Sequence, residues 1–383
     1  MIPVALAFAV LELGDAGDLG LVLASFTVGR LLFVLAGGVW ADRLDRRLVM
    51  VGADLVRGTG QAGLAVLLLT GSASVWHFAA VGFFVGSASA FFGPASTGLI
   101  PQTVSPARLQ EANAFLSLSD SATSLAGPAL SGLLVAVVGS GAVFAIDAAS
   151  FFVSALFVSS LRVPRGVVPA RQRFLTEVAE GLHVIRKRSW LVAAFLTFGI
   201  GNFAIATFFV LGPLVVEQEL GGARDWGLIM TGSAVGGIIG GILALRVKPG
   251  RPLLVSFPIV CLAGLQLLFL IEPFALPLQI VAAVAAVASI VFANALWDTV
   301  CQQHVPRETL SRVNSVDWAI SLVLMPIGFA LAGPFAEAVG VDAALAIAAA
   351  FGIVPHLAIL LVPSVRDLRR LDTPASDQEA PGT

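Results

Sequence analysis

The sequence is poor in the residues from which nucleotide sites, metal sites and disulfide frameworks are built. Its 383 residues include two cysteines, four histidines and, among 22 basic residues, only two lysines. Neither Lys187 nor Lys248 follows a glycine, so the Gly-Lys-Ser/Thr end of a phosphate-binding loop is absent. Because this loop is absent, the chain is not expected to be an ATPase itself.

The few cysteines and histidines do not form site patterns. Cys261 and Cys301 each lie in a long apolar stretch, and the histidines are scattered without metal-ligand spacing. No nucleophile, base and orienting residue cluster together, and no basic patch indicates nucleic-acid binding. We therefore expect neither an enzyme nor a metal or cofactor, and no nucleic-acid partner.

Apolar residues, by contrast, are abundant. Hydrophobic residues make up 57% of the chain, charged residues 12%, and the mean hydropathy is +0.94, far from the values of soluble domains. About 20 apolar residues cross a bilayer as a helix, and eleven stretches reach that length. The composition predicts an all-α integral membrane protein. The predicted spans are 20–41, 48–70, 75–99, 112–138, 142–161, 190–216, 225–247, 253–272, 274–303, 312–337 and 341–362.

The basic residues predict the orientation of these spans. The segment 42–47 carries Arg43, Arg46 and Arg47, and connections rich in Lys or Arg stay on the cytoplasmic side. With this connection inside, every connection after an even-numbered span is also expected inside, and all but three of the 22 basic residues lie in or beside those connections or in the tail. We expect a multi-pass monomer in the lipid bilayer of a bacterial-type cytoplasmic (inner) membrane, with the central loop and C-terminus cytoplasmic.

The chain also contains an internal repeat. An offset of 201 residues pairs Asn113 with Asn314 and Gly132 with Gly333, and many transporters consist of two six-helix halves. We expect two six-helix bundles in a pseudo-twofold arrangement, joined by a cytoplasmic linker that contains an amphipathic helix. The predicted domains are an N-terminal bundle at 1–163, the linker at 164–189, a C-terminal bundle at 190–362 and a mobile cytoplasmic tail at 363–383.

The segment 38–47 resembles the loop between the second and third helices of the major facilitator superfamily, with Asp45 where many members carry glycine. Further short matches, among them Phe92-Gly93-Pro94-Ala95, follow in the order of its exporter branch, which includes the enterobactin exporter and macrolide efflux proteins. The resemblance implies a conformational switch, in which Asp42 latches the inner face. An ordinary positive-inside anchor is the alternative. The matching residues are Gly38, Asp42, Arg43, Arg46 and Arg47.

The stretch around Pro128 resembles the antiporter motif of drug exporters in the same superfamily, with Gly127 and Gly132 on either side. Thr123 and Ser131 stand where that motif has glycines. Proline removes a backbone donor and weakens a helix, while glycine lets helices approach closely. The stretch therefore indicates either an element of proton antiport or a kinked packing helix.

Polar side chains within apolar spans are costly and are functional candidates by default. Asp54 and Arg57 are expected to pair, because they are three residues apart on one helix, and Asp147 is expected in water near the outer end of its span. Asp120 is the best candidate for a proton carrier, tuned by Arg30 if the two are close. Plain burial with one hydrogen bond each is the alternative. The candidates for proton coupling or a substrate cavity are Arg30, Asp120, Asn294, Trp297, Asp298, Asp317 and Trp318.

Together these features predict a secondary active transporter. Its expected activity is proton-driven efflux of a hydrophobic or amphipathic small molecule, such as a drug, macrolide or siderophore, by alternating access. Uptake of a small metabolite and a transport-dead sensor or scaffold are the alternatives. The apolar stretch from Ile2 to Leu13 covers only about 18 Å at 1.5 Å per residue, short of the ~30 Å hydrocarbon core. The first helix is therefore expected to be N-terminally incomplete, with the true start upstream of Met1. A natural truncation is the alternative.

Overall fold

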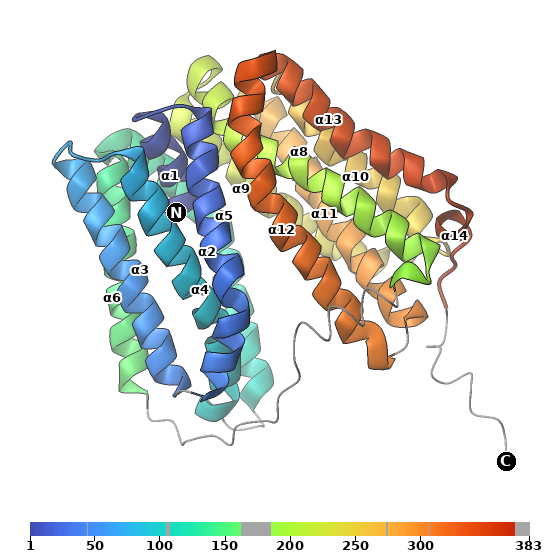
Figure 1. Ribbon diagram of the computed structural model, residues 1–383, viewed down its shortest axis with the longest axis horizontal. Coiled ribbons are helices and arrows are strands. Elements are labelled where there is room, and N and C mark those ends of the chain that lie inside the picture. Colours follow the sequence, from blue (N-terminus) through green and yellow to red (C-terminus); the bar gives the residue numbers. More distant parts are fainter. Residues whose placement is uncertain (44, 105–107, 162–184, 273–274, 306, 372–383) are drawn as a thin grey trace. The chain divides into compact units, whose positions relative to one another are not determined.

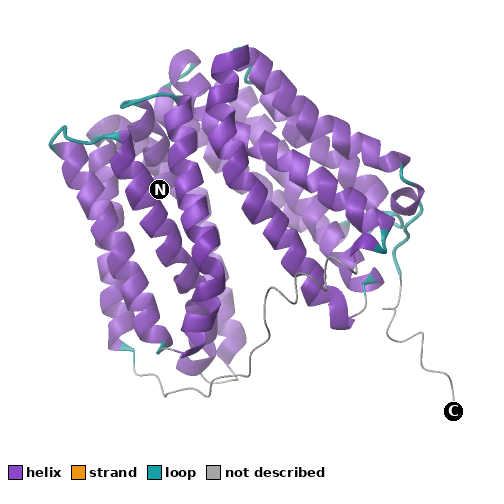
Figure 2. Ribbon diagram, in the orientation of Figure 1, coloured by secondary structure: helices purple, strands orange, loops and turns teal. Residues whose placement is uncertain are grey.

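Helices make up all of the regular structure in the described part of the chain, which contains no strand (Figure 1, Figure 2). The expected all-α class is confirmed. The computed structural model describes residues 1–43, 45–104, 108–161, 185–272, 275–305 and 307–371, with the backbone alone in parts of 34–43, 94–118 and 307–323.

Each of the eleven predicted spans is centred on one long helix (Figure 1). Their ends differ from the prediction by a few residues, because hydropathy marks the apolar part of a helix and not the turn where its backbone hydrogen bonds stop. The helices are α1 Ile2–Leu11, α2 Ala16–Arg43, α3 Arg46–Leu69, α4 Val75–Thr103, α5 Leu109–Val138, α6 Ser140–Ser160, α8 Ser189–Glu219, α9 Gly222–Arg246, α10 Pro252–Leu268, α11 Leu276–His304, α12 Arg307–Val339, α13 Val341–Ala358, η2 Ile359–Leu361 and α14 Pro363–Arg366.

Eight of the described helices are long and apolar enough to cross a membrane, by length and composition. Helix α3 is not among them, because its 24 residues include four charged side chains. Helix α10 has 17 residues and α1 has ten. Each of these three is packed against neighbouring helices: α3 against α4 and α6, α10 against α11 and α13, and α1 against α5 and α6. The two short helices and the more polar α3 are thus covered by protein contacts.

The two halves of the sequence use the same tight connection. Gly139 alone separates α5 from α6, and Gly340 alone separates α12 from α13, 201 residues further along the chain. Their φ angles are 82° and 89°, a region that glycine enters without the steric cost of a Cβ. The predicted repeat is therefore visible in the backbone.

Contacts divide the chain into two compact units that do not follow the midpoint of the sequence. Unit 1 contains α1 to α6, the end of α8, the beginning of α9 and a short piece of α12, and unit 2 contains the remainder. The predicted domain limits at 163, 189 and 362 stay predictions, and most of the predicted linker lies outside the described residues. Unit 1 is Met1–Arg171, Gly212–Thr231 and Phe329–Pro334; unit 2 is Gln172–Leu211, Gly232–Gly328 and Phe335–Thr383.

Unit 1 is built on contacts of α2 with α4, of α3 with α6 and of α3 with α4. The rings of Phe78 in α4 and Phe144 in α6 are fully buried and meet edge to face, with their centroids 5.7 Å apart. This arrangement brings α3, α4 and α6 together around one interior.

Unit 2 has an aromatic interior. Trp297 of α11 contacts Trp190, Phe195 and Phe198 of α8, with ring centroids 5.7, 5.9 and 5.0 Å away. Phe198 in turn stacks on Phe257 of α10 at 6.0 Å. These rings form one buried cluster that joins α8, α10 and α11.

Residues 363–371, the first part of the predicted tail, pack on the same cluster. Val365 is fully buried. Gln303 of α11 donates its Nε2 to the carbonyl oxygen of Leu371 at 2.8 Å and accepts from the Leu371 nitrogen at 3.1 Å. The expectation of a mobile tail therefore concerns only 372–383, which lie outside the described residues.

Candidate functional site

The connection between α2 and α3 is shorter than the loop expected at 38–47. Helix α2 continues to Arg43 and α3 begins at Arg46, so most of that segment is helical. Asp45 caps α3, because its carboxylate accepts a hydrogen bond from the Arg47 nitrogen at 2.9 Å. The aspartate that replaces a glycine of the family motif thus marks where α3 starts.

Arg47 joins this connection to the end of α6. Its Nη1 donates to the carbonyl oxygens of Leu161 at 3.0 Å and Ser159 at 3.3 Å. The side chains of Asp42 and Arg43 lie outside the described residues. In the described part of the motif, one arginine therefore anchors two helices to each other.

The antiporter-like stretch of α5 packs against α1. The fully buried hydroxyl of Ser131 donates to the carbonyl oxygen of Met1 at 2.7 Å. A Cβ added to Gly127 would lie 3.6 Å from the Met1 nitrogen, an ordinary contact. Ser131, which stands where the family motif has glycine, therefore makes a specific contact between two helices.

On a neighbouring face, α5 meets the beginning of α9 backbone to backbone. A Cβ on Gly132 would lie 2.4 Å from the carbonyl oxygen of Ala223, and a Cβ on Gly227 would lie 2.6 Å from the carbonyl oxygen of Pro128. Neither position can hold a side chain unless a helix moves. The motif residues Pro128 and Gly132 therefore form a close helix crossing.

The same kind of crossing occurs between α12 and α2. A Cβ on Gly333 would lie 2.3 Å from Gly17. Gly333 is the repeat partner of Gly132, and Gly17 and Ala223 are each the second residue of their helix. The repeat therefore preserves a pair of glycine crossings, both within unit 1.

The structure does not gather the predicted cavity residues into one described cluster. Arg30 of α2 and Asp120 of α5 are both exposed, and no ion pair joins these two described residues. Asn294 and Asp298 of α11 are exposed as well, whereas Trp297, 6% exposed, belongs to the aromatic interior of unit 2. The side chains of Asp317 and Trp318 lie outside the described residues.

A buried charged cluster lies between α3 and α6. Asp54 forms the predicted ion pair with Arg57 and also accepts a hydrogen bond from Ser154 Oγ at 2.7 Å. The expectation that Asp147 lies in water is wrong: its Oδ2 is buried without a hydrogen-bond partner among the described residues and lies within electrostatic reach of Arg57. The sequence alone does not predict that Asp147 is buried near Arg57, because it does not show which face of α6 packs against α3.

Two carboxylates come close at the connection that follows α1. Loss of water around the Glu12 side chain, and then the nearby carboxylate of Glu217 in α8, raise the pKa of Glu12 above its usual 4.5. Both residues belong to unit 1. The sequence does not indicate this pair, because the two positions are more than 200 residues apart.

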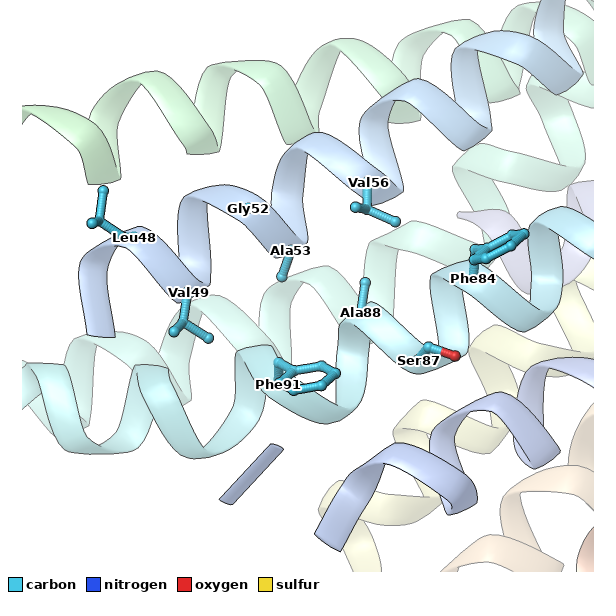
Figure 3. A pocket seen from close by; sticks show the side chains of 9 residues that line it. All are labelled: Leu48, Val49, Gly52, Ala53, Val56, Phe84, Ser87, Ala88 and Phe91. Atoms are coloured by element: carbon cyan, nitrogen blue, oxygen red, sulfur yellow. The ribbon is translucent and has the colours of Figure 1, made fainter. Parts of the chain in front are cut away.

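An open apolar groove lies between α3 and α4 (Figure 3). Its volume is about 320 Å³. Ser87 is its only polar lining side chain, and its hydroxyl already donates to the Phe83 carbonyl oxygen at 2.7 Å. The groove therefore suits an apolar group and offers no proton chemistry. Its lining residues are Leu48, Val49, Gly52, Ala53, Val56, Phe84, Ser87, Ala88 and Phe91.

Similarity to known proteins identifies the family of this chain. Residues 1–328 match the profile of the Major Facilitator Superfamily. The chain belongs to the Major Facilitator Superfamily. This confirms the resemblance noted at segment 38–47, and it establishes a membrane transporter, not an enzyme.

Two relatives within the Major Facilitator Superfamily are efflux proteins. The chain is 25% identical over 350 residues to the macrolide efflux protein A of Streptococcus pyogenes, covering 89% of this chain and 85% of that protein. It is 25% identical over 375 residues to the multidrug efflux pump Tap of Mycobacterium tuberculosis, covering 93% and 87%. A solved mutant of the nucleoside transporter NupG superposes with a TM-score of 0.74 over 94% of each chain at 15% identity, which shows the shared fold alone.

Proposed function

We propose that this transporter exports hydrophobic or amphipathic small molecules, such as a drug, a macrolide or a siderophore, in exchange for protons. The observation that carries the proposal is the likeness to a macrolide efflux protein and a multidrug efflux pump, each aligned over at least 85% of both proteins. Alignment of this extent covers both halves of the fold, so it concerns the whole transport unit and not one shared segment.

Alternating access would use the glycine crossings of unit 1 as a closing surface. At Gly132 and Gly333 the nearest atoms of the facing helix are backbone atoms, those of Ala223 and Gly17. Glycine contributes no side chain to such a contact, so these contacts can separate and re-form without a rotamer change at either glycine. Parting of these crossings would open the transporter on their side of the membrane.

The proposed location is a bacterial-type cytoplasmic membrane, in which the protein is a monomer. The connection between α2 and α3, the central loop and the C-terminus would lie in the cytoplasm, since basic residues concentrate there. The glycine crossings then lie toward the outer surface, because Gly17 is at the opposite end of α2 from Arg43.

The exposed polar residues are the proposed contacts of the substrate path. Asp120 would carry a proton, and Arg30 would tune it. Exchange of Asp120 for asparagine would then abolish proton-coupled flux and spare ligand binding. The exposed carboxylates of Asp120 and Asp298 and the exposed amide of Asn294 suit the polar part of an amphipathic organic molecule. The proposed set for the C-terminal half is Asn294, Asp298, Asp317 and Trp318, with Trp297 supporting α11 from the interior.

A conformational latch is proposed for the inner face. In the outward-open state Asp42 would meet the N-terminal end of α12 near Ser311 and Arg312, whose side chains lie outside the described residues. Helix-dipole and charge interactions of this kind contribute about 0.3 to 1 kcal/mol. The latch would therefore bias the transport cycle without locking it.

Everted membrane vesicles test the proposed export. Vesicles containing the chain and acidified inside by respiration are expected to accumulate radiolabelled erythromycin, a macrolide, and to release it when nigericin collapses the pH gradient. Vesicles without the chain are the control. Accumulation that survives nigericin would contradict proton coupling. Uptake restricted to right-side-out vesicles would indicate import, and binding without flux would indicate a sensor or scaffold.

A further inference from the structure

The interface between α3 and α6 contains more polar groups than its packing uses. Several of its buried polar atoms have no hydrogen-bond partner among the described residues. In folded proteins such atoms are rare and commonly mark bound water or a functional group. We call this set the α3–α6 seam. It consists of Asp54, Arg57 and Gln61 from α3 and Ser140, Asp147 and Ser154 from α6.

One ion pair of the seam compensates its own charges, although the buried Nε of Arg57 has no hydrogen-bond partner among the described residues. Asp54 is 1% exposed and pairs with Arg57 while it accepts from Ser154. The guanidinium carbon of Arg57 lies 4.2 Å from the ring centroid of Phe92 and 4.6 Å from that of Phe151, positions that favour a cation. Arginine keeps its charge in proteins, so Asp54 and Arg57 together form a neutral, immobilised pair.

Asp147 remains without such compensation. It lies seven residues into α6, about 10 Å from the first residue of that helix. The charged groups that face it are Arg57 from α3 and the amino group of Met1 ahead of α1, and neither is hydrogen-bonded to its buried Oδ2. A buried carboxylate without a partner is costly when ionised, and uptake of a proton removes that cost.

Two further buried polar groups belong to the same two helices, at the level of Asp147 and at the end of the helix pair. Gln61 is 5% exposed, lies one turn beyond Arg57 on α3, and has a buried Oε1 without a partner among the described residues. The buried Oγ of Ser140, the first residue of α6, is likewise without a partner there. Helix rise puts Gln61 about 12 Å from the end of α3, at the depth of Asp147. Buried water satisfies polar atoms of this kind and would conduct protons between them.

The equivalent interface of unit 2 shows that packing does not require these charges. A Cβ on Gly58 would lie 3.0 Å from Phe152, and a Cβ on Gly264 would lie 2.6 Å from Ile353. Each of these four residues, the two glycines and the two residues that they face, is the thirteenth of its helix. The pair α3 and α6 therefore packs in the same register as the pair α10 and α13. In that register the positions of Asp54, Arg57 and Asp147 correspond to Val260, Ala263 and Ala348.

We propose that the α3–α6 seam is a proton-binding site in which Asp147 takes up one proton from water that enters past Ser140 and Gln61. The step forms one O–H bond on the carboxylate, and hydronium of the aqueous phase supplies the proton. Arg57 acts as a positioning residue, because its charge faces both Asp54 and Asp147. The claim that this proton drives efflux rests on the proposed function. The claim that the α3–α6 seam binds the proton is independent of it.

Infrared difference spectroscopy of the purified protein in lipid tests the site without a substrate. Acidification is expected to produce C=O bands of protonated carboxyls, among them a band that Asp147→Asn removes and Asp147→Glu restores at a shifted frequency. Glu219→Gln removes an exposed carboxylate of the same unit and is expected to keep the band. A difference spectrum unchanged in Asp147→Asn would assign the proton elsewhere and overturn the proposal.

Proteoliposomes with an entrapped pH dye test the role of this proton. Erythromycin added to the wild type is expected to move protons, and Asp147→Asn is expected to move at least tenfold fewer while it still exchanges labelled for unlabelled erythromycin. A wild type that shows the infrared band but no erythromycin-coupled proton movement would refute the proposed function and leave the site standing. Coupled movement that persists in Asp147→Asn would overturn the coupling role of the seam.

Discussion

Units 1 and 2 contain equivalent helix pairs with different interiors. Between α3 and α6 lie a buried ion pair and a further carboxylate, whereas α10 and α13 meet through small or apolar side chains at the same positions. Unit 2 instead concentrates its large side chains around Trp297. Because glycines fix the same register in both pairs, the backbone contact is independent of the chemistry beside it. The buried charges of unit 1 therefore have an energetic cost that the packing of this helix pair does not require.

The largest expected effect comes from converting the interface of unit 1 into that of unit 2. Arg57→Ala leaves Asp54 buried without its partner and is expected to lower the free energy of unfolding by about 3 to 5 kcal/mol. The triple exchange Asp54→Val, Arg57→Ala and Asp147→Ala removes all three charges, so we expect a stability close to that of the wild type. Thermal unfolding in detergent measures both. A triple variant as unstable as the single one would show that the fold does need these charges.

The glycine crossings are a feature that the two sequence halves share, so equivalent exchanges are expected to act alike. Gly132→Ala and Gly333→Ala each place a Cβ against backbone atoms and are expected to cost about 1 to 3 kcal/mol through overpacking, with reduced erythromycin export. Gly127→Ala, whose Cβ meets only an ordinary contact, is the matched control. Normal transport by Gly132→Ala would argue that these crossings stay open throughout the cycle.

The connections that follow α2 and α9 differ in charge, and this difference provides a control for the proposed latch. Asp42 in the first corresponds to Lys248 in the second, counted from the first residue of each helix. Asp42→Asn is expected to favour the inward-open state by about 0.3 to 1 kcal/mol, roughly a two- to fivefold change. The labelling rate of a cysteine introduced at the exposed Gln302 reports this, since both native cysteines are buried. Lys248→Gln is the control, and equal labelling rates in both variants would refute the latch.

The smallest effect is expected at Glu12, whose pKa is raised in the folded protein. The folded state then binds this proton more tightly than the unfolded state, so stability present below about pH 4.5 is lost as pH rises through the raised value. Glu12→Gln is expected to reduce the slope of the unfolding temperature against pH over this range. Glu272→Gln, an exposed carboxylate of unit 2, is expected to leave the slope unchanged. A slope that persists in Glu12→Gln would assign the titration to another group.

Sequence reasoning succeeded where one physical quantity decides the outcome. Apolar length located the helix within each of the eleven predicted spans, and helical spacing predicted the pair of Asp54 and Arg57. It placed the end of α2 too early, because charged residues lower hydropathy without ending a helix. It also expected Asp147 in water, since the face of α6 that meets α3 depends on tertiary packing. For the same reason hydropathy could not show that Trp297 lies in the interior.

The edge-to-face contact of Trp190 and Trp297 gives the protein an optical signal of its own. The chain contains no tyrosine, so its ultraviolet emission and most of its near-ultraviolet circular dichroism arise from indole groups. Two indoles with centroids 5.7 Å apart at 68° are close enough for their transitions to couple. The resulting dichroic band would vanish when α8 and α11 separate, and a spectrometer could follow the melting of unit 2 without any attached label.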